Sequence, residues 1–198
     1  MSILIKNILH ENKIADILIK KNKIEEIAES INEKADTIID GSDKAALPGF
    51  VNGHTHAAMT LLRGYGDDMV LKEWLETKIW PIEAKMTEED IYWGVKLACL
   101  EMIKTGTTCF NDMYWHFSAM AKATDEMGLR AALAETFIDI AGEKQAKESK
   151  EKTEKAFKES SDFSDRIKFA IAPHAIYTVS RDSLEWLKHF ADKHELLI

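Results

Sequence analysis

From Leu47 onwards, short apolar runs alternate with longer amphipathic segments, and this alternation constrains the fold more than any other feature of the sequence. The runs are nearly continuous in apolar residues, which is typical of parallel strands covered on both faces. Strands that alternate with helices in this way predict a parallel α/β sheet, open or closed. We expect buried strands at residues 50–56, 107–114, 129–138 and 166–173, with "LLI" at 196–198 beginning a fifth. Residues 48–198 are therefore predicted to form four β/α units.

Local signals set the expected helix ends. Thr87 and Asp90 resemble a capping box, so a helix should begin there, and Gly106 should end it. The next helix should close at Gly128, and Ser180 should open the last one. Residues 67–80 also have a helical pattern, which we expect Pro81 to interrupt.

Residues 1–47 have a different character. Their apolar positions are mostly isoleucines in short runs separated by turn residues. We predict a small antiparallel β unit, part of a β-sandwich, that is too small to be stable alone.

Composition limits the classes of partner. The net charge of −8 disfavours nucleic acid and anionic membranes, because both need a clustered basic face. No stretch has the length needed to span a bilayer, and the N-terminus lacks the pattern of a signal peptide. Two isolated cysteines, Cys99 and Cys109, fit a reduced setting, so we expect a cytoplasmic protein.

The stretch "FVNGHTHAAM" places His54 and His56 at the end of the first expected parallel strand. Alternate residues of a strand point to the same face, so the two imidazoles should lie roughly 6.5 Å apart along it. Such a pair can bind one metal ion, although a single His-x-His also occurs by chance. A zinc site needs three or four ligands, so the pair alone is not a complete site.

The ends of the other strands supply further candidates, because catalytic groups gather at the carboxyl ends of parallel strands. His174 follows the fourth strand and is the best of them, although it could also be a capping or packing histidine. Glu135 ends the third strand. Asn111 and Asp112, followed by His116, are weaker candidates, because the chemistry of a turn accounts for an Asn-Asp pair.

Longer motifs resemble a known family. "LPGFVNGHTHAAMTLLRGYGDDMVLKEWLETKIWPIEAKMT", "TGTTCFNDMYW" and "APHAIYTVS" are similar, in this order, to the amidohydrolase superfamily. Within it, they resemble the branch that deaminates methylthioadenosine and S-adenosylhomocysteine. The resemblance implies a (β/α)8 barrel of the TIM type, of which this chain would be the first half, joined to a β-sandwich made from both chain ends.

The resemblance also implies roles for individual residues. His54 and His56 match two of four ligands to a single Zn²⁺, or another divalent ion such as Fe²⁺. Glu83 matches the residue that holds the ribose hydroxyls, and His174 matches a histidine that contacts the substrate. Trp74 is expected to line the nucleoside pocket.

Two departures from the family pattern matter. The family's acid/base residues and remaining metal ligands would lie beyond Ile198, so we expect an N-terminal fragment that is inactive alone. Relatives that accept S-adenosylhomocysteine often carry Arg where this chain has Glu135 and, less securely, Lys147. Glu135 would repel a carboxylate tail, so a neutral 5′ group is expected on the nucleoside.

The resemblance thus implies hydrolytic deamination of adenosine analogues to inosine analogues and ammonia, with a small-molecule nucleoside as partner and a possible homo-oligomer. One alternative is another superfamily enzyme acting on guanine, cytosine or a chlorinated triazine. A second alternative is a non-catalytic metal-binding or assembly module in which two half-barrels pair.

Overall fold

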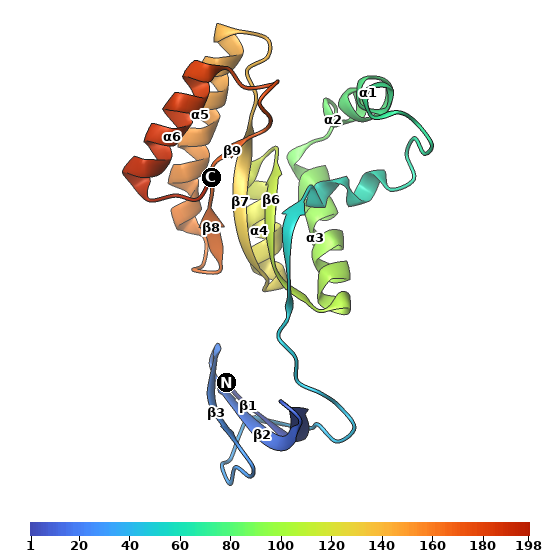
Figure 1. Ribbon diagram of the computed structural model, residues 1–198, viewed down its shortest axis with the longest axis vertical. Helices are drawn as coiled ribbons and strands as arrows, with labels where there is room; N and C mark the ends of the chain where they lie inside the picture. Colours follow the sequence, from blue (N-terminus) through green and yellow to red (C-terminus); the bar gives the residue numbers. More distant parts are fainter. The chain divides into compact units, whose positions relative to one another are not determined.

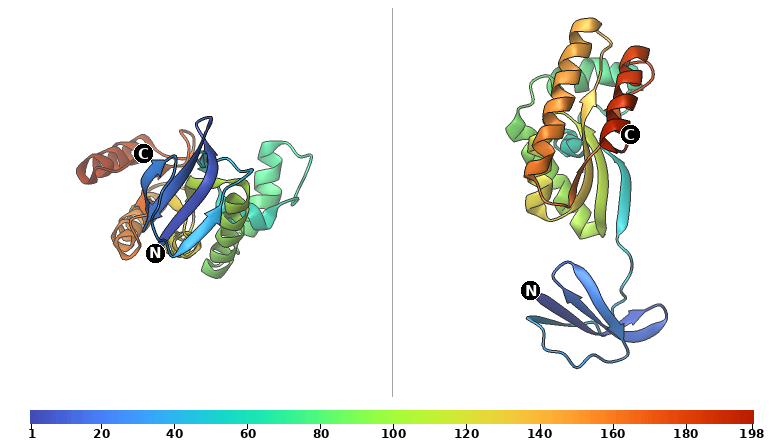
Figure 2. Two further views of the ribbon diagram at one scale, coloured as in Figure 1. Left: turned by 90° about the horizontal axis from the view of Figure 1, so that it is seen from below. Right: turned by 90° about the vertical axis from the view of Figure 1, so that its left-hand side faces the viewer.

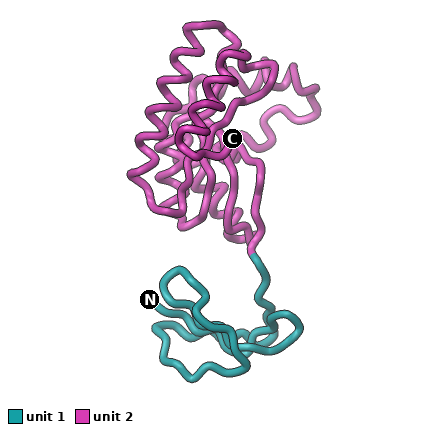
Figure 3. Tube along the Cα trace, turned by 60° about the vertical axis from the view of Figure 1, so that its left-hand side comes forward, with its two compact units in different colours: residues 1–48 teal, residues 49–198 magenta.

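The chain divides after Pro48 into two units in the computed structural model, which describes residues 1–198. The first unit comprises Met1–Pro48 and the second Gly49–Ile198 (Figure 3). The second unit carries all the candidate site residues.

The first unit is a four-stranded sheet in the order β3-β2-β1-β4. Its strands are β1 (Ser2–His10), β2 (Lys13–Lys20), β3 (Lys23–Ala28) and β4 (Thr37–Asp40). The antiparallel prediction is right for β1, β2 and β3 but wrong for β4, which runs parallel to β1. The reason is the connection after β3, in which Ile31 packs on Leu4 and Leu18 and donates its N–H to buried Asp16, 2.9 Å away. The chain thereby crosses the sheet before it enters β4.

The second unit contains a parallel sheet in the order β5-β6-β7-β8, which confirms the predicted α/β class (Figures 1 and 2). Its strands are β5 (Phe50–Thr55), β6 (Thr107–Tyr114), β7 (Arg130–Phe137) and β8 (Ile167–Phe169), with β9 (Ala172–Pro173) also pairing with β7. Ala170 and Leu197 form a parallel bridge where a further strand was expected to begin.

Four long helices pack on this sheet and enclose its hydrophobic core (Figure 1). They are α3 (Glu88–Thr105), α4 (Phe117–Met127), α5 (Glu143–Glu159) and α6 (Arg181–His194). Shorter helical turns are η1 (Ala57–Leu62), α1 (Leu71–Trp74), η2 (Leu75–Ile79), α2 (Trp80–Glu83) and η3 (Ser160–Asp162). No helix combines the length and the apolar character needed to cross a bilayer.

The helix ends confirm the local sequence signals. Thr87 and Asp90 form a reciprocal capping box at the start of α3, and Gly106 ends that helix at φ 85°, in the left-handed region. Gly128 ends α4 in the same conformation, and the Ser180 hydroxyl accepts a bond from the N–H of Ser183 at the start of α6. These helices therefore begin and end at the residues that the sequence predicts.

Two sequence predictions are wrong in detail. Pro81 does not interrupt the helical run, because the preceding turn η2 widens to a π-helix and accommodates the proline ring in the first turn of α2. The first parallel strand is not buried: Phe50 and Val51 of β5 are 69% and 72% exposed. Only β6 pairs with β5, so this strand forms an open edge of the sheet.

Helix α3 approaches η1 closely at Gly94. Replacing Gly94 by Ala tests whether this close packing contributes to stability. A Cβ atom at Gly94 would lie 2.5 Å from the carbonyl oxygen of Ala58. Overpacking of this kind costs about 1–3 kcal/mol, which exceeds the gain of about 1 kcal/mol from replacing a helical glycine. We expect Gly94→Ala to lower the free energy of unfolding in urea titration. Gly53→Ala is the control, because nothing lies within 4 Å of its added Cβ. A more stable Gly94→Ala protein would contradict this packing.

The carboxylate of Asp125 links α4 to the chain before β8. It accepts hydrogen bonds from the Ser164 hydroxyl and the Arg166 guanidinium. The hydrogen bond from the Ser164 hydroxyl holds the pKa of Asp125 below its ordinary value of 3.8, and the Arg166 guanidinium contributes a smaller lowering. A lowered folded-state pKa stabilises the protein above the unfolded pKa, and this contribution disappears as pH falls through the folded value.

Asp125→Asn should therefore reduce the free energy of unfolding at pH 7 by about 1 kcal/mol, with a smaller difference from the wild type near pH 3. Urea titrations at both pH values measure it. Asp162→Asn, at an exposed position on η3, is the control and should change little. A difference that stays constant between the two pH values would show that the Asp125 charge does not contribute.

Candidate functional site

His54 and His56 lie at the end of β5, and their rings meet in an edge-to-face arrangement. Their ring centroids are 5.1 Å apart and the ring planes meet at 80°. His54 is still within the strand, whereas His56 is the residue before η1 and has left extended geometry, with φ −130° and ψ 72°. The bend at His56 brings the two rings closer than the spacing along a straight strand.

Strand β6 holds this segment in place through both backbone and side-chain groups. The Thr55 hydroxyl donates to the carbonyl of Asn111 over 2.8 Å, and the Asn111 amide donates to the carbonyl of Gly53 over 3.3 Å. The Nδ1 atom of His56 lies 3.1 Å from the carbonyl oxygen of Met113. A carbonyl only accepts, so Nδ1 donates to it; in the neutral ring Nε2 then keeps a free lone pair, the arrangement found in metal-binding histidines.

Asp112 completes this attachment, and it lies within a strand as predicted, so the chemistry of a turn does not account for it. It lies inside β6 and is 1% exposed, and both carboxylate oxygens accept from the N–H of Ala57, at 3.2 and 3.3 Å. Burial raises the pKa of Asp112 to about 7, against the opposing effect of the Ala57 hydrogen bond. The carboxylate thus caps the first turn of η1, directly after His56.

Glu83 reaches the same region from α2. Its Oε1 atom accepts a 2.5 Å hydrogen bond from the hydroxyl of Tyr114, the last residue of β6. Burial raises the pKa of Glu83, opposed by the Tyr114 hydrogen bond and by the charge of His56. The Tyr114 ring lies 6.3 Å from the ring of His56. Tyr114 was not singled out from the sequence, and its place at a strand end is the signal that could have identified it.

His174 directly follows β9 and is half-buried. Its backbone N–H donates to the carbonyl of Phe137 over 3.1 Å, and its Nδ1 atom lies 2.9 Å from the hydroxyl oxygen of Thr178. Burial lowers the pKa of His174, and the charge of His56 lowers it further, so the two imidazoles share one region. The structure therefore brings His54, His56, Glu83 and His174 together at the carboxyl end of the sheet.

Trp74 makes its hydrogen bond away from the strand ends. Its indole N–H donates to the carbonyl of Tyr65 over 3.2 Å, which ties α1 to the preceding loop. Trp80 and Trp115, which were not chosen as site residues, line a cleft beside Glu83 instead.

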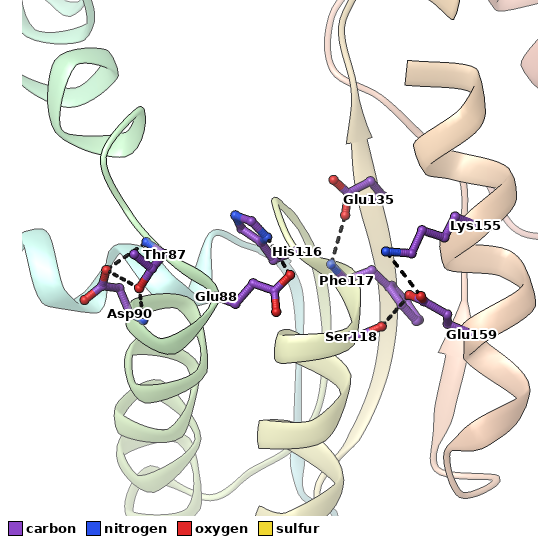
Figure 4. A network of polar contacts seen from close by, with 9 residues as sticks. All are labelled: Thr87, Glu88, Asp90, His116, Phe117, Ser118, Glu135, Lys155 and Glu159. Atoms are coloured by element: carbon purple, nitrogen blue, oxygen red, sulfur yellow. Dashed lines mark hydrogen bonds and ion pairs between the residues drawn. The ribbon is translucent and has the colours of Figure 1, made fainter. Parts of the chain in front are cut away.

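This cleft has a volume of ≈ 580 Å³ and extends from Glu83 to Glu135. Glu135 is 8% exposed, and its Oε2 atom accepts from the N–H of Phe117 over 2.9 Å (Figure 4). Burial raises the pKa of Glu135, opposed by that hydrogen bond and then by the charge of Lys152. Two polar contacts border the cleft: Glu88 with His116 at 3.4 Å, and the ion pair of Lys155 with Glu159 at 3.4 Å (Figure 4).

The fit to a metal ion is partial. His54 and His56 supply two imidazole donors of the type that zinc and iron accept. No group of three or more His, Cys, Asp or Glu side chains in the structure is arranged to hold a metal ion. The chain therefore provides a pair of suitable ligands, and three or four are needed.

Comparison with known proteins identifies relatives whose sequences match nearly the whole of this chain. The model of the amidohydrolase family matches residues 45–198. The chain is 46% identical to a 5′-deoxyadenosine deaminase of Methanocaldococcus jannaschii, over 99% of this chain and 47% of that protein. It is 44% identical to a 5-methylthioadenosine/S-adenosylhomocysteine deaminase of Thermococcus sibiricus, over 98% of this chain and 47% of that protein. The chain thus spans about half the length of the curated relatives that it matches.

Solved structures share the fold. An adenosine deaminase from Xanthomonas campestris with bound zinc superposes with a TM-score of 0.85 at 28% identity, over 98% of this chain and 47% of that one. A guanine deaminase from C. acetobutylicum superposes with a TM-score of 0.82 at 21% identity, over 98% and 51%, which shows the fold alone. The predicted α/β class, with the parallel sheet as part of a TIM-type barrel, is confirmed. By its sequence motifs, its fold and the family match across residues 45–198, the chain belongs to the amidohydrolase family.

Proposed function

We propose that this chain supplies the metal-binding part of a deaminase that hydrolyses adenosine analogues to inosine analogues and ammonia. The convergence of His54, His56, Glu83 and His174 at one end of the sheet carries the proposal. The deaminases among the relatives support the class of reaction.

His54 and His56 would hold one divalent ion per subunit, Zn²⁺ or another such as Fe²⁺. When bound, such an ion lowers the pKa of a water molecule toward neutrality and so supplies hydroxide for attack on the purine ring. The role of the chain is to orient this pair. The bond from His56 Nδ1 to Met113 holds the His56 ring, and the cap of Asp112 on Ala57 holds the turn that follows it.

Glu83 and His174 would orient the nucleoside. The half-buried Glu83 carboxylate can accept hydrogen bonds from ribose hydroxyls, and bonds to a charged acceptor out of water are among the stronger ones. Thr178 holds Nδ1 of His174, which leaves the other ring nitrogen for the substrate. We infer that the acid/base groups come from the half of the relatives that this chain does not match.

Glu135 bears on the 5′ group of the substrate. Its buried carboxylate lies in the cleft that begins at Glu83, so the carboxylate group of a homocysteine tail entering this cleft would meet a like charge at low dielectric. This favours methylthioadenosine and 5′-deoxyadenosine over S-adenosylhomocysteine.

Two other functions are less well supported. An enzyme for guanine, cytosine or a triazine would have no ribose for Glu83 to hold. A non-catalytic assembly module would use the open edge of β5, where Phe50 and Val51 are exposed, to pair with a second half-barrel. Sedimentation of the chain would detect that pairing as a stable dimer.

Completing the barrel tests the proposal. The chain alone should release no ammonia from 5′-deoxyadenosine above background. Co-expressed with the C-terminal half of the Methanocaldococcus jannaschii relative, it should show zinc-dependent release, because that half would supply the missing ligands and acid/base groups. His56→Ala in this chain should reduce turnover by about 100-fold or more, since a metal ligand is lost. Turnover by the chain alone, or an active His56→Ala complex, would refute the proposal.

Substrate profiles of the completed enzyme test the role of Glu135. We expect kcat/KM for 5′-deoxyadenosine to exceed that for S-adenosylhomocysteine by about tenfold or more, equivalent to about 1.4 kcal/mol. Glu135→Gln should narrow this ratio by removing the charge. Glu154→Gln, at an exposed position on α5, should leave it unchanged. Equal rates on both substrates with the unaltered chain would exclude a role for Glu135 in specificity.

A further inference from the structure

Tyr114 and Glu83 form a buried contact whose role is not explained by packing alone. The Tyr114 side chain is 4% exposed, and its hydroxyl donates to Oε1 of Glu83 over 2.5 Å. The sulfur of Met86 is the other neighbour of this hydroxyl, at 4.0 Å. The second oxygen of Glu83, Oε2, has no hydrogen-bond partner in the structure. One oxygen of the carboxylate is therefore occupied and the other is free.

The segment that carries Glu83 is lightly packed. Across α1, η2 and α2, from Leu71 to Glu83, only Ile79 is buried. Leu71 and Trp80 are 65% and 51% exposed. The bond from Tyr114 to Glu83 and the packing of Met86 against the core connect the end of this helical segment to the sheet. A carboxylate on a lightly packed segment would otherwise sample several rotamers.

The location of Tyr114 connects the two parts of the site. Tyr114 and Asp112 are alternate residues of β6, so they share one face of the strand. Asp112 holds the turn after His56, while Tyr114 holds Glu83. One strand thus determines both the position of the imidazole pair and that of the carboxylate.

We infer that Tyr114 is a positioning residue for ribose recognition: it occupies Oε1 of Glu83 and leaves Oε2 as the acceptor for a ribose hydroxyl. The inference rests on the proposed function. It predicts that removing the Tyr114 hydroxyl weakens the preference for a ribose over a deoxyribose, without weakening the binding of the purine.

The first arm of the test needs no ligand and no activity. In NMR spectra of the 198-residue chain, the Tyr114 hydroxyl proton should exchange slowly and show a nuclear Overhauser effect to the side-chain protons of Glu83. In Tyr114→Phe, Glu83 should change from one side-chain rotamer to several. Tyr65→Phe is the matched control, because Tyr65 is 44% exposed and its hydroxyl has no partner in the structure.

The second arm measures binding of two probes to the zinc-loaded chain by NMR titration: 5′-deoxyadenosine, and 2′,5′-dideoxyadenosine, which lacks the 2′ hydroxyl. The wild-type chain should bind 5′-deoxyadenosine about fivefold more tightly, as expected for about 1 kcal/mol from one hydrogen bond. In Tyr114→Phe, the affinity for 5′-deoxyadenosine should fall to within about twofold of the affinity for 2′,5′-dideoxyadenosine. The affinity for 2′,5′-dideoxyadenosine should stay as in the wild type.

The outcomes separate the two ideas. Equal weakening of both probes in Tyr114→Phe would indicate a merely structural role and overturn the inference, as would a Glu83 rotamer that stays fixed. If neither probe binds the wild-type chain, the proposed function loses its support, while the first arm still decides the position of Glu83. If Tyr114→Phe does not fold, the hydroxyl resonance of Tyr114 in the wild-type chain tests whether the contact with Glu83 exists. If no slowly exchanging hydroxyl resonance is found there, the inference is overturned.

Discussion

The segment from Gly53 to Ala57 has its shape because strand β6 binds it along its whole length. The carbonyl groups of Asn111 and Met113 accept from Thr55 and His56, and the Asp112 carboxylate accepts from Ala57. Parallel strands end at the same edge of a sheet, so these bonds form where β5 finishes. The direction of the His56 ring, and the bend that brings it to His54, depend on this attachment.

The same strand extends the constraint to the substrate side. Tyr114 follows Asp112 by two residues and reaches Glu83, so the distance between the imidazole pair and the carboxylate follows from the pleat of one strand. Strand β6 can fix these positions because it lies inside the sheet and pairs with β5 on one side and β7 on the other.

Features set by residues close together in the sequence could be predicted from it, whereas contacts between residues far apart in the sequence could not. The caps of α3 depend on residues three apart, so Thr87 and Gly106 were recognised. The cap that Asp112 provides could not be predicted, because its partner, Ala57, lies 55 residues away. Tyr114 was missed for the same reason, since Glu83 is 31 residues away and on a different type of element. The roles of Glu83 and His174 came from the family resemblance, because no periodic pattern distinguishes a substrate contact from a packing residue.

The central claim is that His54 and His56 jointly bind a divalent cation, and anomalous X-ray scattering at the zinc edge tests it most directly. Crystals of the chain grown with zinc, and of the completed barrel, would be measured on both sides of the edge. The account predicts one strong anomalous peak at about 2.1 Å from the Nε2 atoms of both histidines. A peak bound by only one of them, or zinc located at another site while the two rings stay metal-free, would contradict it.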